Sequence, residues 1–261
     1  MQNESEIKVY SVWDLPVRLF HWINFVSVIG LLFMGFMMLY KKELGITSLE
    51  AKIALKTVHV FIGYVFVTNL LIRLIWAFVG NRFARWSAIL PGRGQLTQIR
   101  SYLAALKTSQ PQVWLGHNPM GKLAVAFLYL LLVTMAVTGL VRAGTDIYYP
   151  PFGAWAQAYV AADGIAPEQV KPYDETQVNP EKFAELKAFK SPFGKVHLYT
   201  AYTLLAMLIL HIAAVIVVEK REGGALISAM FTGKKYLQGQ PEDASKDDQV
   251  NSPGDPLRVH R

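Results

Sequence analysis

The sequence predicts an all-α membrane protein, a bundle of four transmembrane helices, from two observations. Hydrophobic residues make up 52% of the 261 residues and charged residues only 17%, whereas soluble domains carry about 25% charged residues. Four apolar runs are also long enough to cross a bilayer, which takes about 20 residues. These runs cover residues 19–40, 58–80, 123–141 and 196–218.

The first two helices are expected at about 17–40 and 56–80, joined by a short polar loop. The first one begins too far from the N-terminus, and is too long and too aromatic, for a cleaved signal peptide, and no small-residue cleavage site follows it. We therefore expect it to remain in the mature protein as a membrane span.

The third helix is expected at about 121–142. The segment before it, 81–122, contains a helical pattern, "QLTQIRSYLAAL", and the motif "GHNP", whose Asn-Pro pair marks a turn or a helix start. We expect this segment to lie along the cytoplasmic surface of the membrane.

The largest polar segment, 142–194, precedes a fourth helix at about 194–219. A loop of this length usually has a function, and its aromatic residues favour a surface that docks a partner; an interfacial aromatic belt with a short amphipathic helix is the alternative. These residues are Tyr148, Tyr149, Phe152, Trp155, Tyr159 and Tyr173. Residues 1–238 would form one membrane domain, and the acidic, Pro-rich residues 239–261 a disordered cytoplasmic tail.

The distribution of charge predicts the orientation. The formal net charge is +7, but the basic residues flank the apolar runs, which indicates contact with membrane lipid and not with nucleic acid. The two terminal segments and 81–122 hold fifteen Lys and Arg residues, and the other two loops hold ten. By the positive-inside rule, this excess predicts that both termini are cytoplasmic.

The candidate ligands within the membrane are histidines. The sequence has no cysteine, which excludes disulfides, thiolate-bound iron–sulfur clusters and a C-x-x-C-H haem attachment site. Four of the six histidines lie in or at the edge of apolar runs: His21, His59, His197 and His211. A single one could simply hydrogen-bond a neighbouring helix, but ionisable residues in a membrane are costly, and four of them indicate a function.

Helix geometry groups these four histidines into two pairs. His197 and His211 are 14 residues apart, so at about 100° and 1.5 Å per residue they share one face and lie about 21 Å apart along the axis. With the N-terminus inside, His21 is level with His211 near the cytoplasmic side, and His59 is level with His197 near the outer side. Reversing the orientation exchanges the sides and keeps the pairs.

Two histidines that converge from facing helices, with no carboxylate or thiolate nearby, suit a haem iron with two axial imidazoles. The sequence therefore predicts two b-type haems, one toward each side of the membrane. The axial separation excludes a dinuclear metal site, and zinc normally takes at least three protein ligands. His117, in "GHNP", is interpreted as a cap or surface contact, with a quinone or propionate role as the alternative, while His260 in the tail carries no signal.

Three further residues fit this arrangement. Gly35 follows His21 by 14 residues and Gly63 follows His59 by one turn, and both would leave space for the outer haem. Arg73 follows His59 by 14 residues, so its cation would lie at the depth of the inner haem, where a propionate would balance it. Small residues are common in membrane helices, and Arg73 could instead snorkel to the interface.

Irons with both axial positions filled would only exchange electrons, so we expect quinone as the mobile substrate. Candidates for its pocket lie at the start of the first helix: Asp14, Arg18, Trp22 and Asn24. Asp14 could instead cap the helix, and Trp22 could anchor it at the interface. The alternatives from other classes are a transporter with a histidine proton relay, a haem transporter, and a structural anchor without a cofactor.

Three segments, "VWDLPVRLFHWINFVSVIGLLFMGF", "VHVFIGYVFVTNLLIRLIWAFVGNRFARW" and "GHNPMGKLAVAFLYLLLVTMAVTGL", resemble the b-type cytochrome subunit of membrane-bound nickel–iron hydrogenases, within the wider cytochrome b561-type family. They cover roughly half the chain, and "RLIWAFVGNRFARW" and "GHNP" are the most specific. The resemblance implies a four-helix dihaem anchor in the bacterial cytoplasmic membrane, which carries electrons from an extracytoplasmic hydrogenase to quinone. It also implies haem ligands at His21, His59, His197 and His211.

The fourth helix departs from this family. It begins "FGKVHLYTAY", where a pair of adjacent histidines is expected in the hydrogenase subunits. This end is more similar to general b561-type cytochromes, which serve c-type cytochromes and other oxidoreductases. The expected partner, docked on 142–194, is therefore the iron–sulfur small subunit of a hydrogenase or another extracytoplasmic redox protein. The chain would act as the membrane subunit of a hydrogen:quinone oxidoreductase, and a homo-oligomer is compatible with the sequence.

Overall fold

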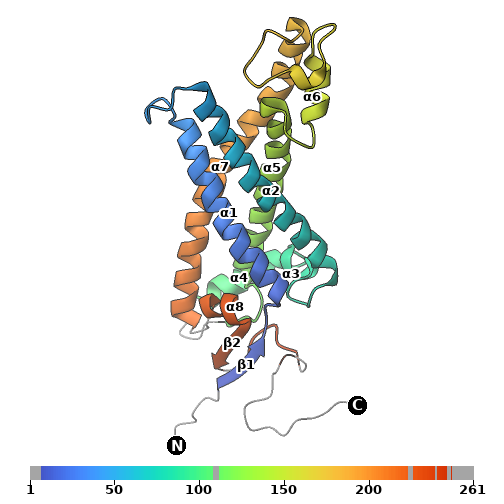
Figure 1. Cartoon of the computed structure of the whole chain (residues 1–261). Coiled ribbons are helices and arrows are strands. Elements are labelled where there is room, and N and C mark those ends of the chain that lie inside the picture. Colours follow the sequence, from blue (N-terminus) through green and yellow to red (C-terminus); the bar gives the residue numbers. More distant parts are fainter. Residues whose placement is uncertain (1–6, 108–111, 223–225, 239, 246–247, 249–261) are drawn as a thin grey trace, which may run out of the picture. The chain divides into compact units, whose positions relative to one another are not determined.

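The computed structural model describes residues 7–107, 112–222, 226–238, 240–245 and 248. Its long elements within these residues are four helices (Figure 1), namely α1 (Leu15–Leu39), α2 (Leu49–Val79), α5 (Pro119–Ile147) and α7 (Pro180–Glu222). Each of them contains an apolar stretch long enough to cross a membrane. The described part of the chain is thus mostly helical, with four long apolar helices as the sequence predicts.

The surface of these four helices suits lipid. Only 6% to 22% of each apolar stretch is buried inside the protein, and large side chains such as Phe33, Ile75 and Phe78 are 60% to 71% exposed. Contiguous apolar surface of this kind is rare on soluble monomers and marks contact with a membrane or a partner. We therefore treat the four helices as membrane spans.

Each long helix begins behind a short polar side chain that caps its first turn. The side-chain oxygens accept a hydrogen bond from a backbone N–H of that turn at 2.7–3.1 Å. The capping residues are Asp14, Ser48, Asn118 and Asn179. Caps of this kind stabilise a helix by about 1 kcal/mol each, and a proline, which favours the first helical position, follows both asparagines.

The helices extend beyond the apolar runs. Helix α2 begins at Leu49 and not near 56, α5 continues to Ile147, and α7 begins at Pro180 and not near 194. The added turns, such as "EKFAELKAFK" in α7, are polar but rich in strong helix formers, so hydropathy alone does not show them. The segment between α5 and α7 is consequently 148–179, shorter than the 142–194 expected.

The shorter elements include a small sheet that the all-α prediction lacks. Strands β1 (Ile7–Ser11) and β2 (Lys234–Gln238) pair antiparallel, with Ile7 opposite Gln238. The remaining helices among the described residues are α3 (Trp86–Ile89), α4 (Gln95–Ala105), α6 (Gly153–Val160), the 3₁₀ turn η1 (Pro167–Gln169) and α8 (Leu226–Thr232).

The chain divides into two compact units, and every long helix contributes residues to both. Unit 1 comprises Met1–Trp22, Ile72–Leu128 and Leu208–Arg261, and unit 2 comprises Ile23–Leu71 and Tyr129–Met207. The buried cluster of unit 1 consists of Tyr10, Val12, Trp13, Val17, Phe83, Ala84, Leu115, Ala229 and Leu237. A cluster in unit 2 packs α6 and the start of α7 and consists of Ala156, Val160, Val170, Val178 and Leu186.

Candidate functional site

Unit 2 contains His59 on α2 and His197 on α7, one of the two expected pairs. Their ring centroids are 6.3 Å apart and the ring planes are inclined by 69°. Both side chains are half-buried, and Nδ1 of His59 is buried without a hydrogen-bond partner among the described residues. The structure therefore brings the two imidazoles of this pair to the same place in one unit.

A threonine that sequence reasoning missed holds one of these rings. Thr138 of α5 is 5% exposed, and its Oγ1 lies 2.9 Å from Nδ1 of His197. The same hydroxyl donates its single hydrogen to the carbonyl of Thr134, at 2.6 Å, so it can only accept from the ring. The proton of His197 is then on Nδ1, and the lone pair of Nε2 is available to a metal ion.

Glycines lie on three helices of the unit that holds this pair, α1, α2 and α5. A Cβ at Gly139, next to Thr138 on α5, would lie 3.4 Å from Cε1 of His197, an ordinary van der Waals contact, so the ring packs directly beside α5. At Gly35 and Gly63, by contrast, an added Cβ would meet no atom within 4 Å. Contacts within the protein therefore do not require glycine at these two positions. Open space there is compatible with a bulky bound group.

Charged residues gather near the same pair. Asp146 on α5 forms ion pairs with three basic side chains. They are Lys56 on α2 (3.2 Å), Arg142 on α5 (2.5 Å) and Lys190 on α7 (2.9 Å). Arg142 and Asp146 are close enough to His197 to act on it electrostatically. One carboxylate thus ties three of the long helices together beside the histidine pair.

Unit 1 contains the second pair, His21 on α1 and His211 on α7. The two imidazoles are close enough for a charge on one to act on the other. The ring of His21 contacts the edge of Trp22, with centroids 5.2 Å apart, and its Nδ1 is buried without a hydrogen-bond partner among the described residues. Both histidines are half-buried.

Arg73 on α2 also belongs to unit 1, and it does not snorkel to the surface. Its side chain is 4% exposed, and Nη2 donates to the carbonyl of Ala84 at 3.0 Å. The guanidinium lies 5.8 Å from the centre of the Phe20 ring, the residue before His21. A buried cation therefore lies within the unit that holds the His21 and His211 pair.

His117 is a further histidine of this unit, and its environment differs from the expected cap or surface contact. Asn118, and not His117, caps α5, while the His117 ring packs against Trp13 with centroids 5.1 Å apart. Loss of water around the ring, and then nearby charges, lower the pKa of His117 to about 3, so the imidazole is neutral. The groups that act on it electrostatically are Lys235, His211, Arg73 and Lys122.

Sequence reasoning missed this neighbourhood because part of it comes from the C-terminal strand. Lys235 on β2 is 2% exposed, and its Nζ donates to the carbonyls of Trp114 (3.0 Å) and Gly116 (3.4 Å). These two carbonyls belong to the segment that leads to His117. A lysine more than a hundred residues away in the sequence gives no signal that it approaches "GHNP".

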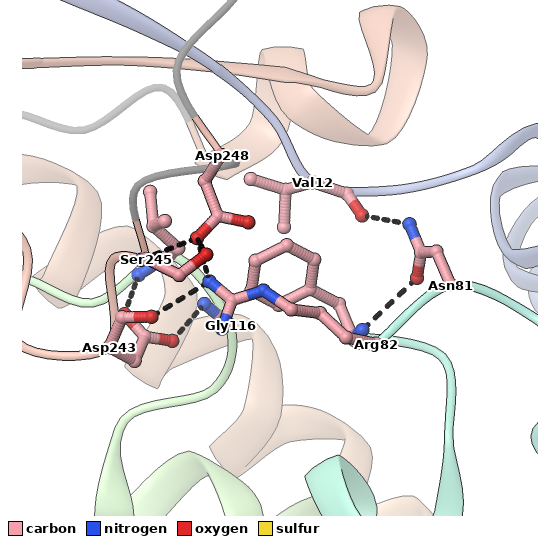
Figure 2. Close-up of polar contacts among 9 residues, drawn as sticks. Val12, Asn81, Arg82, Gly116, Asp243, Ser245 and Asp248 are labelled. Carbon is pink, nitrogen blue, oxygen red and sulfur yellow. Dashed lines mark hydrogen bonds and ion pairs between the residues drawn. The ribbon is translucent and has the colours of Figure 1, made fainter.

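The C-terminal residues hold the same segment (Figure 2). Asp243 accepts hydrogen bonds from the backbone N–H groups of Leu115 (2.6 Å) and Gly116 (2.8 Å), and Arg82 donates to its carbonyl at 2.7 Å and pairs with Asp248. Of the tail that we expected to be disordered, residues 240–245 and 248 are described, and Asp243 and Asp248 bond other residues of unit 1. The rest of it, including His260, lies outside the described residues.

The four candidates for a quinone pocket have different hydrogen-bond partners or belong to different units. The Asp14 carboxylate caps α1 and also accepts from Trp76 Nε1 (2.9 Å) and the Asn81 backbone N–H (3.3 Å). Arg18 and Trp22 both bond backbone carbonyls at the end of α8, with Trp22 Nε1 3.1 Å from the Met230 oxygen. Asn24 belongs to unit 2. Asp14 therefore has a structural role in the start of α1.

The 148–179 segment of unit 2 displays some of its aromatic residues and buries others. Tyr148 and Tyr159 pack against the unit 2 cluster, whereas Trp155 is 49% exposed. Trp155 stacks on Tyr159 with centroids 5.9 Å apart, and it contacts Phe189 of α7 edge-on at 6.1 Å. An exposed aromatic patch therefore lies on α6 and the polar first turns of α7.

Each unit thus pairs two histidines from different spans, with orphaned ring nitrogens or open space beside them, which fits the axial ligation of a haem. A sequence profile described as prokaryotic cytochrome b561 matches residues 12–233. The chain belongs to the prokaryotic cytochrome b561 family. As a b-type membrane cytochrome it has haem b as its cofactor, held without covalent attachment because no cysteine is present.

Several curated relatives of this b561-family chain share the same name. It is 34% identical to the probable Ni/Fe-hydrogenase 1 B-type cytochrome subunit of Escherichia coli (strain K12), over 53% of this chain and 63% of that protein. The probable Ni/Fe-hydrogenase B-type cytochrome subunit of Cupriavidus necator is 28% identical, over 59% of this chain and 65% of that protein. The subunit of the same name from Azotobacter vinelandii is 33% identical, over 49% of this chain and 57% of that protein. The chain therefore spans less than two thirds of each of these relatives. No solved structure matches it significantly.

Proposed function

We propose that this cytochrome holds two haems b and passes electrons between an extracytoplasmic redox partner and the membrane quinone pool. The observation that carries the proposal is the division of the four membrane histidines between the two units. His59 and His197 fall in unit 2, and His21 and His211 fall in unit 1. This division agrees with the two pairs that helix geometry predicts.

The four histidines would be the axial ligands, one pair for each haem. The bound haem iron supplies a one-electron couple between its ferric and ferrous states. With imidazole in both axial positions, no coordination site would be left for oxygen or a substrate. The protein therefore limits the chemistry to electron exchange.

Other side chains would orient the ligands and set the local charge. Thr138 keeps the proton of His197 on Nδ1, which would leave Nε2 to bind the iron. Arg73, buried in unit 1, favours the reduced form of the haem there, because a nearby cation opposes the added positive charge of ferric iron. At Gly35 and Gly63 an added Cβ would meet no atom within 4 Å, so these positions would leave room for a macrocycle.

We further propose that unit 1 is the cytoplasmic one and that quinone is reduced there. The excess of Lys and Arg in the terminal segments and in 81–122 supports this orientation. Arg18 and Trp22 are the pocket candidates that remain near the α8 end of unit 1. Quinone would take up two electrons, one at a time, and two protons from the cytoplasm to give the quinol.

The printed names of the relatives support a hydrogenase small subunit as the electron donor. Its docking surface would be the exposed aromatic patch around Trp155 on the 148–179 segment. The start of the fourth apolar run, "FGKVHLYTAY", favours a second candidate, a c-type cytochrome or another oxidoreductase, because the adjacent histidines expected in hydrogenase subunits are absent there.

A pyridine haemochrome assay on the purified full chain, combined with a reduced-minus-oxidised spectrum, tests the proposal. We expect two protohaems per polypeptide, low-spin b-type bands, and reduction by a water-soluble quinol without loss of haem. One haem or none in a folded preparation would contradict the dihaem arrangement. Haem that leaves the protein during turnover would indicate haem transport instead of electron transfer.

A further inference from the structure

The ion-pair cluster around Asp146 contains more positive than negative charge. Lys56, Arg142 and Lys190 surround one carboxylate, so the cluster carries two positive charges in excess. The nearby carboxylate of Glu175 is already paired with Lys187, at 2.9 Å. The side chain of Asp146 is only 10% exposed, and those of Lys56, Lys190 and Arg142 are 24%, 20% and 34% exposed.

Excess positive charge in this partly buried cluster destabilises the protein unless an anion balances it. The cluster lies at the ends of apolar helices, where the surroundings have a lower dielectric constant than water, and a partly buried ion without a counter-ion is destabilising. A membrane protein that keeps three cations around one carboxylate therefore gains from a further anionic group beside them. That group would have to carry about two negative charges to balance the cluster.

The cations also share helix faces with the residues of the histidine pair. Lys56 precedes His59 by three residues on α2, and Lys190 precedes His197 by seven on α7. Arg142 follows Thr138 by four residues on α5. Spacings of three, four and seven residues return to the same face of a helix, so three helices each place one cation one or two turns from the histidine pair, all on the side of Asp146.

The packing of α7 against α5 brings the guanidinium toward the pair. A Cβ at Gly194 would collide with the Arg142 guanidinium, so glycine at this position allows the arginine to lie across α7. Gly194 is one turn before His197. Arg142 thus pairs with the Asp146 carboxylate and also lies against α7 at Gly194, close enough to His197 to act on it electrostatically.

We propose that Lys56, Arg142 and Lys190 bind the propionates of the haem held by His59 and His197. This inference rests on the proposed function. Haem b bears a pair of propionates, whose charge equals the excess of the cluster, and guanidinium and ammonium groups are the usual partners of carboxylates. Asp146 keeps the three cations in place when the propionates are absent, and it competes with them when they are present.

Haem binding by apo-protein provides the test. The full chain carrying His211→Ala, which retains only the pair in unit 2, is prepared in detergent from haem-limited cells and titrated with protohaem or with its dimethyl ester. Arg142→Gln or Lys190→Gln is expected to weaken protohaem binding about tenfold, the equivalent of one charge-assisted hydrogen bond. The ester, whose propionates are uncharged, should lose less than about twofold. Asp146→Asn should instead tighten protohaem binding.

The matched control is Lys187→Gln, which removes a cation from the same helix but one that pairs with Glu175. It should leave the affinity for both ligands unchanged. Equal losses for protohaem and ester would show that the cluster only ties the helices together, and no loss would exclude it as the propionate site; either result overturns this inference alone. Absence of haem from the unmodified chain would overturn the proposed function, and this site with it.

Discussion

The two histidine pairs lie in surroundings that differ in the way the protein holds the imidazoles and balances charge. In unit 2, Thr138 fixes the proton of His197, and Asp146 lies among the cations beside the pair. In unit 1, Nδ1 of His21 has no hydrogen-bond partner among the described residues, as is also true of His59 in unit 2. Two cations of unit 1, Arg73 and Lys235, are only 4% and 2% exposed.

This difference shows how one ligand set can give two redox centres with unlike properties. Axial ligands of the same kind leave hydrogen bonding, burial and nearby charge as the means of tuning a haem. Water screens a buried cation less than an exposed one, so the charges of unit 1 should act more strongly than those of unit 2. On the proposed function, the haem of unit 1 has the higher reduction potential, and electrons flow toward the quinone side.

Removal of single histidine ligands should have the largest effect on haem content. If the proposed pairing were wrong, the four variants would not divide into two pairs that each lose one haem. His59→Ala and His197→Ala should each lose the same haem, identified by its midpoint potential, while His21→Ala and His211→Ala should each lose the other. The total haem content, measured as the pyridine haemochrome, should fall by half in all four variants. If His59→Ala and His211→Ala removed the same haem, the two units would not correspond to two sites.

His117→Ala is the control for this series. Its imidazole lies in unit 1 near His211 but takes no axial position in the proposed arrangement. Both haems should remain, with any change confined to the potential of the haem in unit 1. Loss of a haem from this variant would make His117 a ligand and would change the assignment of the pair.

The effect of Thr138→Val should be the next in size. Valine has nearly the shape of threonine but cannot accept the hydrogen bond from Nδ1, so His197 loses the group that fixes its tautomer and orientation. Loss of a partner of this kind typically weakens metal binding between about 10- and 100-fold. Titration of apo-protein with haem should show this loss for the unit 2 site, while Thr138→Ser, which keeps the hydroxyl, should bind almost normally.

Spectroscopy separates this positioning role from a purely structural one. If Thr138 orients the imidazole, the low-spin electron paramagnetic resonance signal of the unit 2 haem should change in the valine variant, and the signal of the unit 1 haem should not. Equal changes in both signals, or a loss of affinity without a spectral change, would mean that the threonine only supports helix packing.

Replacement of Arg73 should change a potential and not the haem content. Arg73→Gln removes a buried cation from unit 1. This change stabilises the ferric form of that haem relative to the ferrous form, so its midpoint potential should fall. A shift of about 59 mV, a tenfold change in the ferric to ferrous ratio, is expected in a potentiometric titration. Arg73→Lys should lower it much less, and a similar fall in the unit 2 haem would contradict the separation of the two sites.

Much of the frame of this protein follows from local sequence, because lipid requires long apolar helices and helical spacing groups His21 with His211 and His59 with His197. The helical turns beyond the apolar runs escape a hydropathy argument, since their side chains are polar. Other features depend on contacts between residues far apart in the chain. Neither the pairing of β1 with β2 nor the approach of Lys235 to the "GHNP" segment has a local signal.

The charged cluster in unit 2 was partly visible in the sequence. Arg142 and Asp146 are four residues apart at the end of an apolar run, a spacing that favours an ion pair on a helix. Their other partners, Lys56 and Lys190, lie on different helices, and only the packing of those helices brings them to the same carboxylate. The sequence therefore suggests the ion pair within one helix, whereas the cluster of four charged residues follows only from the packing of the three helices.

Removal of a C-terminal contact of unit 1 should have the smallest effect on the protein. It tests whether the two units respond separately, because these contacts involve residues of unit 1 and none of unit 2. Asp243→Asn removes one of the carboxylate oxygens that accept from Leu115 and Gly116, which should cost about 1 kcal/mol. A change of this size lowers the apparent unfolding temperature by a few degrees. Heating scans at one fixed rate, which irreversible unfolding requires, would measure it through the Soret band.

Glu242→Gln is the control, because this neighbouring side chain is exposed and should not alter the unfolding temperature. The segment held by Asp243 leads to His117, which lies near His211 and Arg73. Loosening this segment should therefore change the potential or the quinol reactivity of the unit 1 haem alone. If the unit 2 haem responded equally, the C-terminal contacts would stabilise the whole bundle, and the two histidine pairs could not be tuned independently.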